Sequence, residues 1–401
     1  MSVFIPKVLK SPKLLARLSF SSVRTNGDWL DIQEVTKKKV KPPVESLGFG
    51  KFTEHMLTVK WTKNTGWEKP LIKPHGTLAI DPAATVLQYA QTVFEGTKAV
   101  RGVDGKIRMF RPKHNMARMN MSAARACLPQ FDQKMILEAI RKLILIDQDW
   151  VPDGELTSLY IRPTMIGTEP CFGVRAAEEV LLYVILSPVG PYFKEFKPIT
   201  LDCNLDFVRA WPGGTGYTKM GANYASNLYP MELAKKKNCD VNAWMFGEDH
   251  QITESGATNI FFMIERWSGT KELVTPPLDG LILPGVTRQS IIELAPKYDL
   301  TVVEKTMPME DLLCDLKDGA LLEMFATGTA TSVLPVGRFL YKGERYQVPT
   351  PKDGVAARFL KEIQDICSGK VESPWAVELE EWKLEEDEDI PDYVDQLTYL
   401  K

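Results

Sequence analysis

One lysine and one glutamate in the middle of the chain have surroundings suited to amine chemistry. Lys219 lies in the glycine-rich stretch WPGGTGYTKMGANY, which contains few charges. Glu254 lies in a turn that leads into the β-branched and aromatic run Thr258 to Phe262. A lysine amine is a good nucleophile when desolvation or a nearby cation favours its neutral form. A reactive lysine with one acidic group to hold a pyridinium is what a pyridoxal phosphate site requires of its protein.

Taken alone, this pair does not define a function, because most lysines are solvated surface groups. A run of segments spaced along the chain carries a stronger signal. The segments are FGKFTEHML, FEGTKAVRGVDGKIRMFRPKHNMARM, LYIRPTMIGTEPCFGV, TKMGANYASN, ITESGATNIFF, LPGVTRQSI and ATGTATSVLPV. In this order they resemble the branched-chain amino acid aminotransferases, pyridoxal phosphate enzymes of the D-amino-acid-transaminase-like fold (fold type IV). The resemblance covers roughly residues 45 to 379.

The resemblance implies roles around the cofactor. Lys219 would carry pyridoxal phosphate and, once freed by the substrate amine, act as the general acid and base. Glu254 would bind the pyridine nitrogen, and Tyr224 would lie near the phenolic oxygen. An arginine and the N–H groups at the start of a helix suit a phosphate group. The implied cofactor-binding set is Lys219, Glu254, Tyr224, Arg118, Val286, Thr287 and Thr329.

On the substrate side, the resemblance implies an aromatic and apolar pocket with two polar groups. The implied residues are Phe49, Tyr89, Tyr160, Arg162, Ala330 and Val174. Apolar walls suit a branched aliphatic side chain, and Tyr160 with Arg162 could orient substrate carboxylates. Val174 matches a residue that the family contributes across a subunit interface, so a homodimer is expected.

The expected reaction is reversible transfer of the amino group of leucine, isoleucine or valine to 2-oxoglutarate, which gives branched 2-oxo acids and glutamate. D-amino acid transaminase and aminodeoxychorismate lyase share the lysine and the glutamate, so these residues do not discriminate. The segments LYIRP and FEGTKAVRG favour the branched-chain enzyme. A catalytically silent scaffold is the alternative from another class. The presence of Lys219, Glu254, Tyr224 and Arg118 together argues against it.

Two departures from the family pattern affect the expectations. Where the family commonly has Gly-Thr after the glutamate, this chain has Gly256-Ala257, followed by Thr258. One hydroxyl contact is therefore expected to be missing or displaced. Some members also carry a redox CxxC pair where this chain has Thr331 and Leu334, so that thiol switch is expected to be absent.

The pattern of the chain predicts the elements that position these residues. Residues 28–187 are expected to form a small α+β domain, with strands at 55–61, 159–163 and 180–186, helices at 116–127 and 133–147, and a hairpin turn at Val103-Asp104-Gly105. Residues 188–197, rich in Pro and Gly, are expected to link it to a larger α/β domain at 198–379. Strands at 243–245, 259–264, 301–304 and 321–326 and helices at 287–295 and 309–316 are expected there.

Composition indicates a globular protein and argues against a membrane-spanning or metal-binding one. The 401 residues, 44% hydrophobic and 25% charged, suit a globular protein with two cores. The longest apolar run, VLLYVIL, is far too short to span a bilayer. Six cysteines and four histidines lack ligand spacing, so we expect a reducing compartment and no metal site.

Charge is concentrated at the two ends. Residues 1–27 hold five basic residues and no acid, which is typical of a mitochondrial transit peptide; a basic tail on a cytosolic protein is the alternative. Residues 380–401 hold nine acidic residues against two lysines and are expected to be disordered. The body between them is nearly neutral, which gives no electrostatic case for nucleic acid or an anionic membrane as partner.

Overall fold

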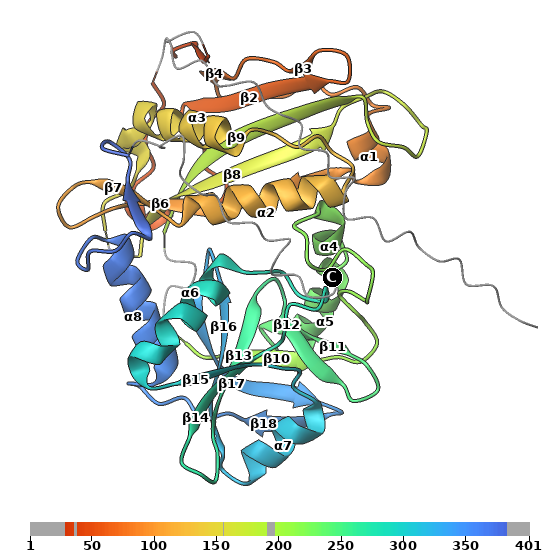
Figure 1. Cartoon of the computed structure of the whole chain (residues 1–401), viewed down its shortest axis with the longest axis vertical. Coiled ribbons are helices and arrows are strands. Elements are labelled where there is room, and N and C mark those ends of the chain that lie inside the picture. The colour runs from red at the N-terminus through yellow and green to blue at the C-terminus, as the bar shows by residue number, and fades with distance from the viewer. Residues whose placement is uncertain (1–28, 36–37, 155, 191–196, 383–401) are drawn as a thin grey trace, which may run out of the picture.

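Two large β-sheets organise the fold, one built mainly from each half of the chain (Figure 1). The structure, a computed structural model, describes residues 29–35, 38–154, 156–190 and 197–382. The first sheet has the order β1-β4-β2-β9-β8-β6-β7-β19, with β3 paired to β2 and β5 to β8. Its strands are β1 (Asp31–Ile32), β2 (His55–Thr62), β3 (Gly66–Trp67), β4 (Leu71–Pro74), β5 (Thr92–Phe94), β6 (Thr97–Arg101), β7 (Ile107–Phe110), β8 (Ser158–Gly167), β9 (Glu179–Val189) and β19 (Ala376–Glu378).

Helices α2 (Pro112–Arg125) and α3 (Gln133–Ile146) cover this first sheet (Figure 1). In α3 the apolar residues recur at helical spacing, and Ile136, Ile140 and Leu143 are fully buried in the core beneath the helix. Asp132 caps the helix by accepting a hydrogen bond from the Met135 N–H at 3.0 Å. The same core takes Met116 from α2 and residues of the strands, so the sheet and both helices share one apolar interior.

The second sheet has the order β12-β11-β10-β17-β16-β13-β14-β15, with β18 paired to β17. Its strands are β10 (Ile199–Cys203), β11 (Val241–Phe246), β12 (Gln251–Ser255), β13 (Asn259–Glu265), β14 (Lys271–Thr275), β15 (Thr301–Glu304), β16 (Leu321–Gly328), β17 (Ser332–Tyr341) and β18 (Glu344–Gln347). The helices of this half are α4 (Gly221–Ala225), α5 (Leu228–Lys236), α6 (Val286–Leu294), α7 (Met309–Lys317) and α8 (Val355–Cys367).

Strand β13 shows why this second sheet is apolar on both faces. Ile260 and Phe262 point into the core that α7 closes, whereas Phe261 and Met263 point into the core that α6 and α8 close. Successive side chains of a strand face opposite sides, so a strand covered on both faces is a continuous apolar run. The run NIFFMI is buried throughout, as this arrangement requires.

The remaining short elements are helix α1 (Thr85–Tyr89) and three 3-10 turns at Val44–Ser46, Gln148–Trp150 and Ala295–Tyr298. The hairpin expected at Val103-Asp104-Gly105 is confirmed. It joins β6 to β7, and Gly105 takes the left-handed conformation (φ +80°) that this turn needs. No helix within the described ranges combines the length and apolarity that crossing a bilayer would require.

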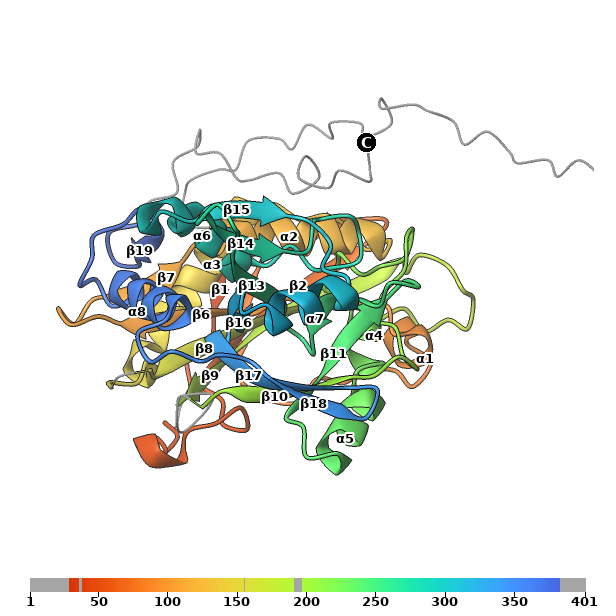
Figure 2. The same ribbon diagram turned by 90° about the horizontal axis from the view of Figure 1, so that it is seen from below.

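Sheet pairing does not follow the expected domain boundaries. Strand β9 runs to Val189, beyond the boundary placed at residue 187, because its pairing with β8 continues from Gly167 back to Ser158. At the other end, β19 leaves the second half and pairs with β7 of the first sheet, and both views show α8 beside these strands (Figure 1 and Figure 2). The expected transit segment at 1–27, most of the linker and residues 383–401 lie outside the described residues.

Candidate functional site

The backbone of Lys219 is fixed between the two halves of the molecule. Its N–H donates to Ser122 Oγ of α2 at 2.9 Å, and its carbonyl accepts from the Phe94 N–H of β5 at 3.1 Å. The next residue, Met220, forms a β-bridge with Val93. The first sheet therefore holds the lysine, although the lysine itself precedes α4 of the second half.

The amine of Lys219 has an aromatic and hydroxylic environment. Nζ donates to Tyr224 Oη at 2.9 Å and lies 5.0 Å from the centre of the Phe94 ring. The Phe94 and Tyr224 rings meet edge to face, with centroids 4.7 Å apart. Gly221 opens α4 where an added Cβ would lie 2.6 Å from Thr92 Cγ2, so a glycine allows this helix to approach β5. The structure thus brings Lys219 and Tyr224 together.

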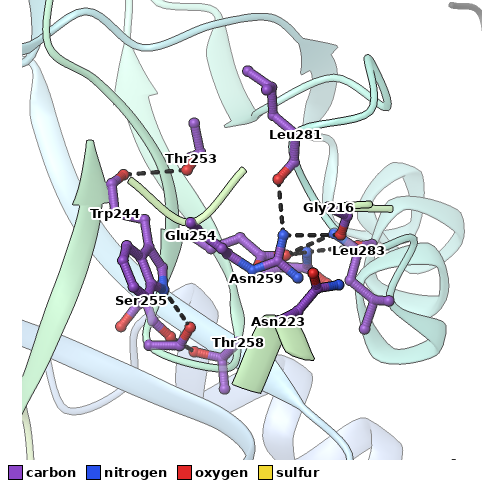
Figure 3. Close-up of polar contacts among 12 residues, drawn as sticks. Gly216, Asn223, Trp244, Thr253, Glu254, Ser255, Thr258, Asn259, Leu281 and Leu283 are labelled. Atoms are coloured by element: carbon purple, nitrogen blue, oxygen red, sulfur yellow. Dashed lines mark hydrogen bonds and ion pairs between the residues drawn. The ribbon is translucent and has the colours of Figure 1, made fainter. Parts of the chain in front are cut away.

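Glu254 is a buried carboxylate on β12, with polar partners on both oxygens. Oε1 accepts from Asn259 Nδ2 at 3.0 Å and from the Leu283 N–H at 2.8 Å, as Figure 3 shows. Oε2 lies 2.7 Å from Nε of Arg209. A carboxylate offers about four lone-pair sites, two on each oxygen. Three are used here, and the fourth is on Oε2.

Arg209 is a site residue that sequence reasoning missed. Its Nη1 donates to the Gly216 carbonyl at 2.8 Å and to the Leu281 carbonyl at 2.9 Å, which fixes the guanidinium beside Glu254. Burial raises the pKa of Glu254, and the Arg209 guanidinium opposes that rise. The run DFVRAWPGG has no spacing that predicts this pairing, because Arg209 and Glu254 meet only through the folded sheet.

Arg118 is also buried, and it is held by a second buried carboxylate that sequence reasoning missed. Its Nε and Nη2 donate to the two oxygens of Glu95 at 2.7 and 2.9 Å. Burial alone would raise the pKa of Glu95, but Arg118, with help from Asn115, lowers it below its ordinary range. Nη1 of Arg118 donates to the Pro284 carbonyl at 2.9 Å, so the arginine lies at the loop that leads into α6.

Three residues expected to bind a phosphate group line one small cavity: Val286, Thr287 and Thr329. Val286 and Thr287 begin α6, whose N-cap is Gly285 and whose first turn accepts no side-chain cap. The N–H groups of a first helical turn favour an anion. The hydroxyls of Thr327 and Thr331, before and after Thr329, are buried without a hydrogen-bond partner among the described residues. Lys98 and Ser332 line the same cavity.

A larger cavity of about 720 Å³ is lined by three of the six residues expected to contact substrate. Phe49, Tyr160, Thr329 and Ala330 are among its lining residues. The Phe49 ring meets Tyr160 edge to face at 5.3 Å. Arg162 donates to Tyr160 Oη at 3.1 Å, and its guanidinium lies 4.9 Å from the centre of the Phe94 ring that also faces Lys219. The Arg162 Nε is buried and has no partner among the described residues.

Two expected substrate residues, Tyr89 and Val174, lie elsewhere on this chain. Tyr89 ends α1, and its hydroxyl donates to the Phe172 carbonyl. Val174 is 85% exposed and Phe172 is 71% exposed, so the loop presents apolar side chains to its surroundings. Neither Tyr89 nor Val174 lines the two cavities described above.

The structure shows where the residues lie that depart from the family pattern, which are Ala257, Thr331 and Leu334. Ala257 is exposed in a tight turn, and the hydroxyl of the following Thr258 donates to the Ser255 carbonyl at 2.6 Å (Figure 3). That hydroxyl is therefore committed to its own turn and does not replace the missing one. Thr331 and Leu334, at the positions where some family members carry the redox CxxC pair, both line the large cavity.

A cluster of Glu54, His55 and Asp147 has spacing that could hold a metal ion. His55 Nδ1 lies 2.7 Å from Asp147 Oδ1, and its Nε2 accepts from the Val35 N–H at 3.3 Å. Glu54 Oε1 accepts from the Lys39 N–H at 3.0 Å. Because both imidazole nitrogens have protein partners, we interpret the cluster as a link between β2, the end of α3 and the segment before β2.

Known families and proteins are similar to this chain over most of its length. Residues 92–339 match the family described as amino-transferase class IV. The chain is 51% identical over 356 residues to the cytosolic branched-chain-amino-acid aminotransferase of Mus musculus, which covers 87% of this chain and 92% of that protein. It is 44% identical over 382 residues to the mitochondrial branched-chain-amino-acid aminotransferase of Bos taurus, covering 93% and 97%.

The structure was compared with solved structures. It is similar to the branched-chain amino acid aminotransferase from Thermobaculum terrenum in its PLP form, with a TM-score of 0.62 and 18% identity. The match covers 80% of this chain and 98% of that one. At this level of identity the similarity supports the fold alone.

Proposed function

We propose that the amine chemistry of this chain, which belongs to the class IV aminotransferase family, is centred on Lys219 with pyridoxal phosphate as cofactor. The fold expected from the sequence is confirmed by the same membership. The chain is a branched-chain-amino-acid aminotransferase, which transfers the amino group of leucine, isoleucine or valine to 2-oxoglutarate. The 51% identity over 92% of the mouse enzyme is the observation that carries this function.

The residues of the site fit pyridoxal phosphate. Bound there, the cofactor would supply an aldehyde for the amine and a ring that accepts electrons from the substrate α-carbon. Glu254 has one open lone-pair site, on Oε2, for a pyridine N–H. Tyr224 Oη, next to Lys219 Nζ, would donate to the phenolic oxygen. The uncapped start of α6 and Thr329 would bind the phosphate group.

Lys219 is placed to move a proton as well as to bind. Once its amine is free, Nζ would take a proton from the substrate α-carbon and give it to the cofactor carbon on the other side of the substrate nitrogen. Its hydrogen bond to Tyr224 and the Phe94 ring keep Nζ in one place during this exchange. Burial of Glu254 and Arg209 keeps water from the carboxylate that holds the cofactor ring.

Tyr160 and Arg162 would orient the substrate carboxylate, and Phe49 with Ala330 would form the apolar wall of the pocket. The two polar residues are linked through the hydrogen bond to Tyr160 Oη, and the Arg162 Nε retains an unused N–H. A guanidinium can bind a carboxylate through two parallel hydrogen bonds.

Gly96→Ala is expected to raise the KM for leucine about tenfold, because overpacking of this kind costs about 1–3 kcal/mol. An added Cβ would lie 2.0 Å from Tyr160 Oη and 2.9 Å from Cζ, so the ring must move. Steady-state kinetics would measure KM and kcat, with Gly48→Ala as the control because an added Cβ there meets nothing within 4 Å. An unchanged KM would mean that Tyr160 does not position the substrate.

A homodimer with shared sites is proposed, since Val174 is exposed here and would complete the pocket of a second copy. Coexpression of a Lys219→Ala chain with a Val174→Asp chain tests this. Each hybrid dimer would contain one intact site, so activity should return to about a quarter of the wild-type level, although each variant alone is inactive or weak. Sedimentation of the wild type should give twice the 45.2 kDa chain mass. Absence of recovery in verified hybrid dimers would contradict the shared site.

The substrate assignment is tested by one comparison of rates. Purified protein is assayed with leucine and 2-oxoglutarate, beside D-alanine and aminodeoxychorismate, after its cofactor absorbance is recorded. Leucine turnover far above the other two is the expected result. Cofactor absorbance together with turnover of D-alanine, but no turnover of leucine, would instead identify a D-amino acid transaminase. A protein without cofactor absorbance would favour a silent scaffold.

For location in the cell we propose the mitochondrial matrix, because residues 1–27 are basic and free of acids. The names of the relatives include both a cytosolic and a mitochondrial enzyme. Import of the full chain into isolated mitochondria tests the proposal. A chain that stays outside and sensitive to protease would place it in the cytosol.

A further inference from the structure

We propose that Lys98 is a phosphate-binding residue of this site and supplies the uncompensated positive charge for the cofactor phosphate. This inference rests on the proposed function, because it assumes that the cofactor binds at Lys219. Lys98 lies on β6 and is not among the cofactor-binding residues expected from the sequence. The cation that faces the small cavity at the start of α6 decides which residue supplies this charge.

Lys98 lines this small cavity together with Val286, Thr287 and Thr329. Of the described residues around the cavity, Lys98 alone carries a charge. These residues come from β6, α6 and the loop between β16 and β17, so three separate elements converge there. A helix start, a threonine and an ammonium form a donor set suited to a phosphate group.

The Lys98 amine is held in position but is not neutralised. Nζ donates to Ser332 Oγ at 2.9 Å, and no carboxylate pairs with it in the described part of the chain. Ser332 is itself buried and has φ +55°, a conformation that L-residues rarely adopt. The loop therefore maintains a strained residue whose hydroxyl fixes the lysine. An ammonium has three N–H donors, so two are left for a ligand.

Arg118 does not provide the same charge. Both Glu95 oxygens bind its guanidinium at 2.7 and 2.9 Å, so the pair is close to neutral as seen from the cavity. A phosphate monoester carries a charge of roughly −1.5 to −2 near pH 7. A neutral pair and a helix start leave most of that charge uncompensated, and Lys98 is the cation that lines the small cavity with no carboxylate paired to it among the described residues.

The same amine also borders the large cavity, so a substrate carboxylate is the competing ligand for it. The two ligands differ in a testable way. If Lys98 binds the cofactor phosphate, its removal weakens binding of pyridoxal phosphate but not of pyridoxal, which lacks the phosphate. If it binds a substrate carboxylate, the KM for 2-oxoglutarate rises and cofactor binding does not change.

The experiment uses the full-length enzyme, freed of cofactor and titrated with pyridoxal phosphate or pyridoxal while absorbance and tryptophan fluorescence are recorded. Lys98→Met is expected to raise the dissociation constant of pyridoxal phosphate about 10- to 100-fold, the loss of one hydrogen bond to a charged group. Lys98→Arg should retain most of the affinity. Lys361→Met is the matched control, since Lys361 lies on α8, lines the large cavity but not the small one, and has a side chain that is 74% exposed.

Each other outcome has a definite meaning. An equal loss of affinity for pyridoxal and for pyridoxal phosphate would show a general distortion of the site and would overturn the assignment of Lys98. An unchanged affinity for the cofactor with a raised KM for 2-oxoglutarate would also overturn it, because Lys98 would then bind a substrate carboxylate. If the wild type takes up no pyridoxal phosphate at all, the proposed function itself fails. Tight binding by the wild type and by Lys98→Met would overturn only the role of Lys98.

Discussion

Lys219→Ala is expected to lower the turnover of leucine with 2-oxoglutarate by roughly 10⁴-fold or more. Two functions are lost together, because Nζ is both the nucleophile and the proton carrier, and proton transfer by a positioned group alone contributes about 10²- to 10⁴-fold. No other lysine amine in the described ranges lies beside Tyr224 and Phe94. Turnover would be measured at saturating substrate.

Covalent binding gives the second readout for this variant. Borohydride reduction of the wild-type enzyme should add the cofactor mass to the peptide that contains Lys219, and the variant should show no such label. Lys235→Ala is the control, because Lys235 is an exposed lysine of α5 paired with Glu232 at 2.7 Å. Thermal unfolding should show that both variants fold. If the Lys219→Ala variant carried the label at another lysine and still turned over leucine at a substantial rate, the assignment of Lys219 would be contradicted.

The part of the site that could be predicted from the sequence is its local part. Lys219 and Tyr224 are five positions apart across the start of a short helix, so the helix itself brings their side chains close together. The hairpin at Gly105 and the buried run of β13 are local in the same sense. Their residue types fix the geometry wherever the elements are placed.

The partners of the buried charges could not be predicted. Arg118 was recognised by its type and its neighbours, yet its position depends on Glu95, which lies on another element. Arg209 meets Glu254 across the second sheet. A sequence gives the charge of each side chain, but compensation is decided by which side chains share a low-dielectric interior. Lys98 was missed for the converse reason, since its proposed role depends on its having no paired carboxylate within the described ranges.

The expected substrate residues fall into two groups, those that meet within one chain and those that do not. Phe49, Tyr160 and Ala330 converge within one chain because β8 and the loop before β17 face each other across the large cavity, and Arg162 joins them through its hydrogen bond to Tyr160. Tyr89 and Val174 do not line that cavity, and the proposed homodimer would bring Val174 to the site of a second copy. A residue that acts in another subunit has no signature in its own chain beyond an exposed apolar side chain, which Val174 has.

Glu254→Ala is expected to give the second-largest effect, and it should act on stability and turnover together. The change leaves Arg209 buried without its counterion, and breaking a buried ion pair on one side destabilises a protein by about 3–5 kcal/mol. It also removes the carboxylate proposed to hold the pyridine N–H. Loss of one preorganised electrostatic group lowers kcat by roughly 10²- to 10³-fold. Denaturant unfolding and steady-state kinetics would measure the two effects.

The double variant Glu254→Ala with Arg209→Met separates the two effects. Without the guanidinium there is no uncompensated buried charge, so much of the lost free energy of unfolding should return, because replacing a buried pair by apolar groups is often close to neutral. Turnover should stay low, since the acceptor on Oε2 is still missing. Arg209→Met alone should lower turnover as well, because burial raises the pKa of Glu254 and the opposing cation is gone. Recovery of both stability and turnover in the double variant would mean that Glu254 serves only to neutralise Arg209.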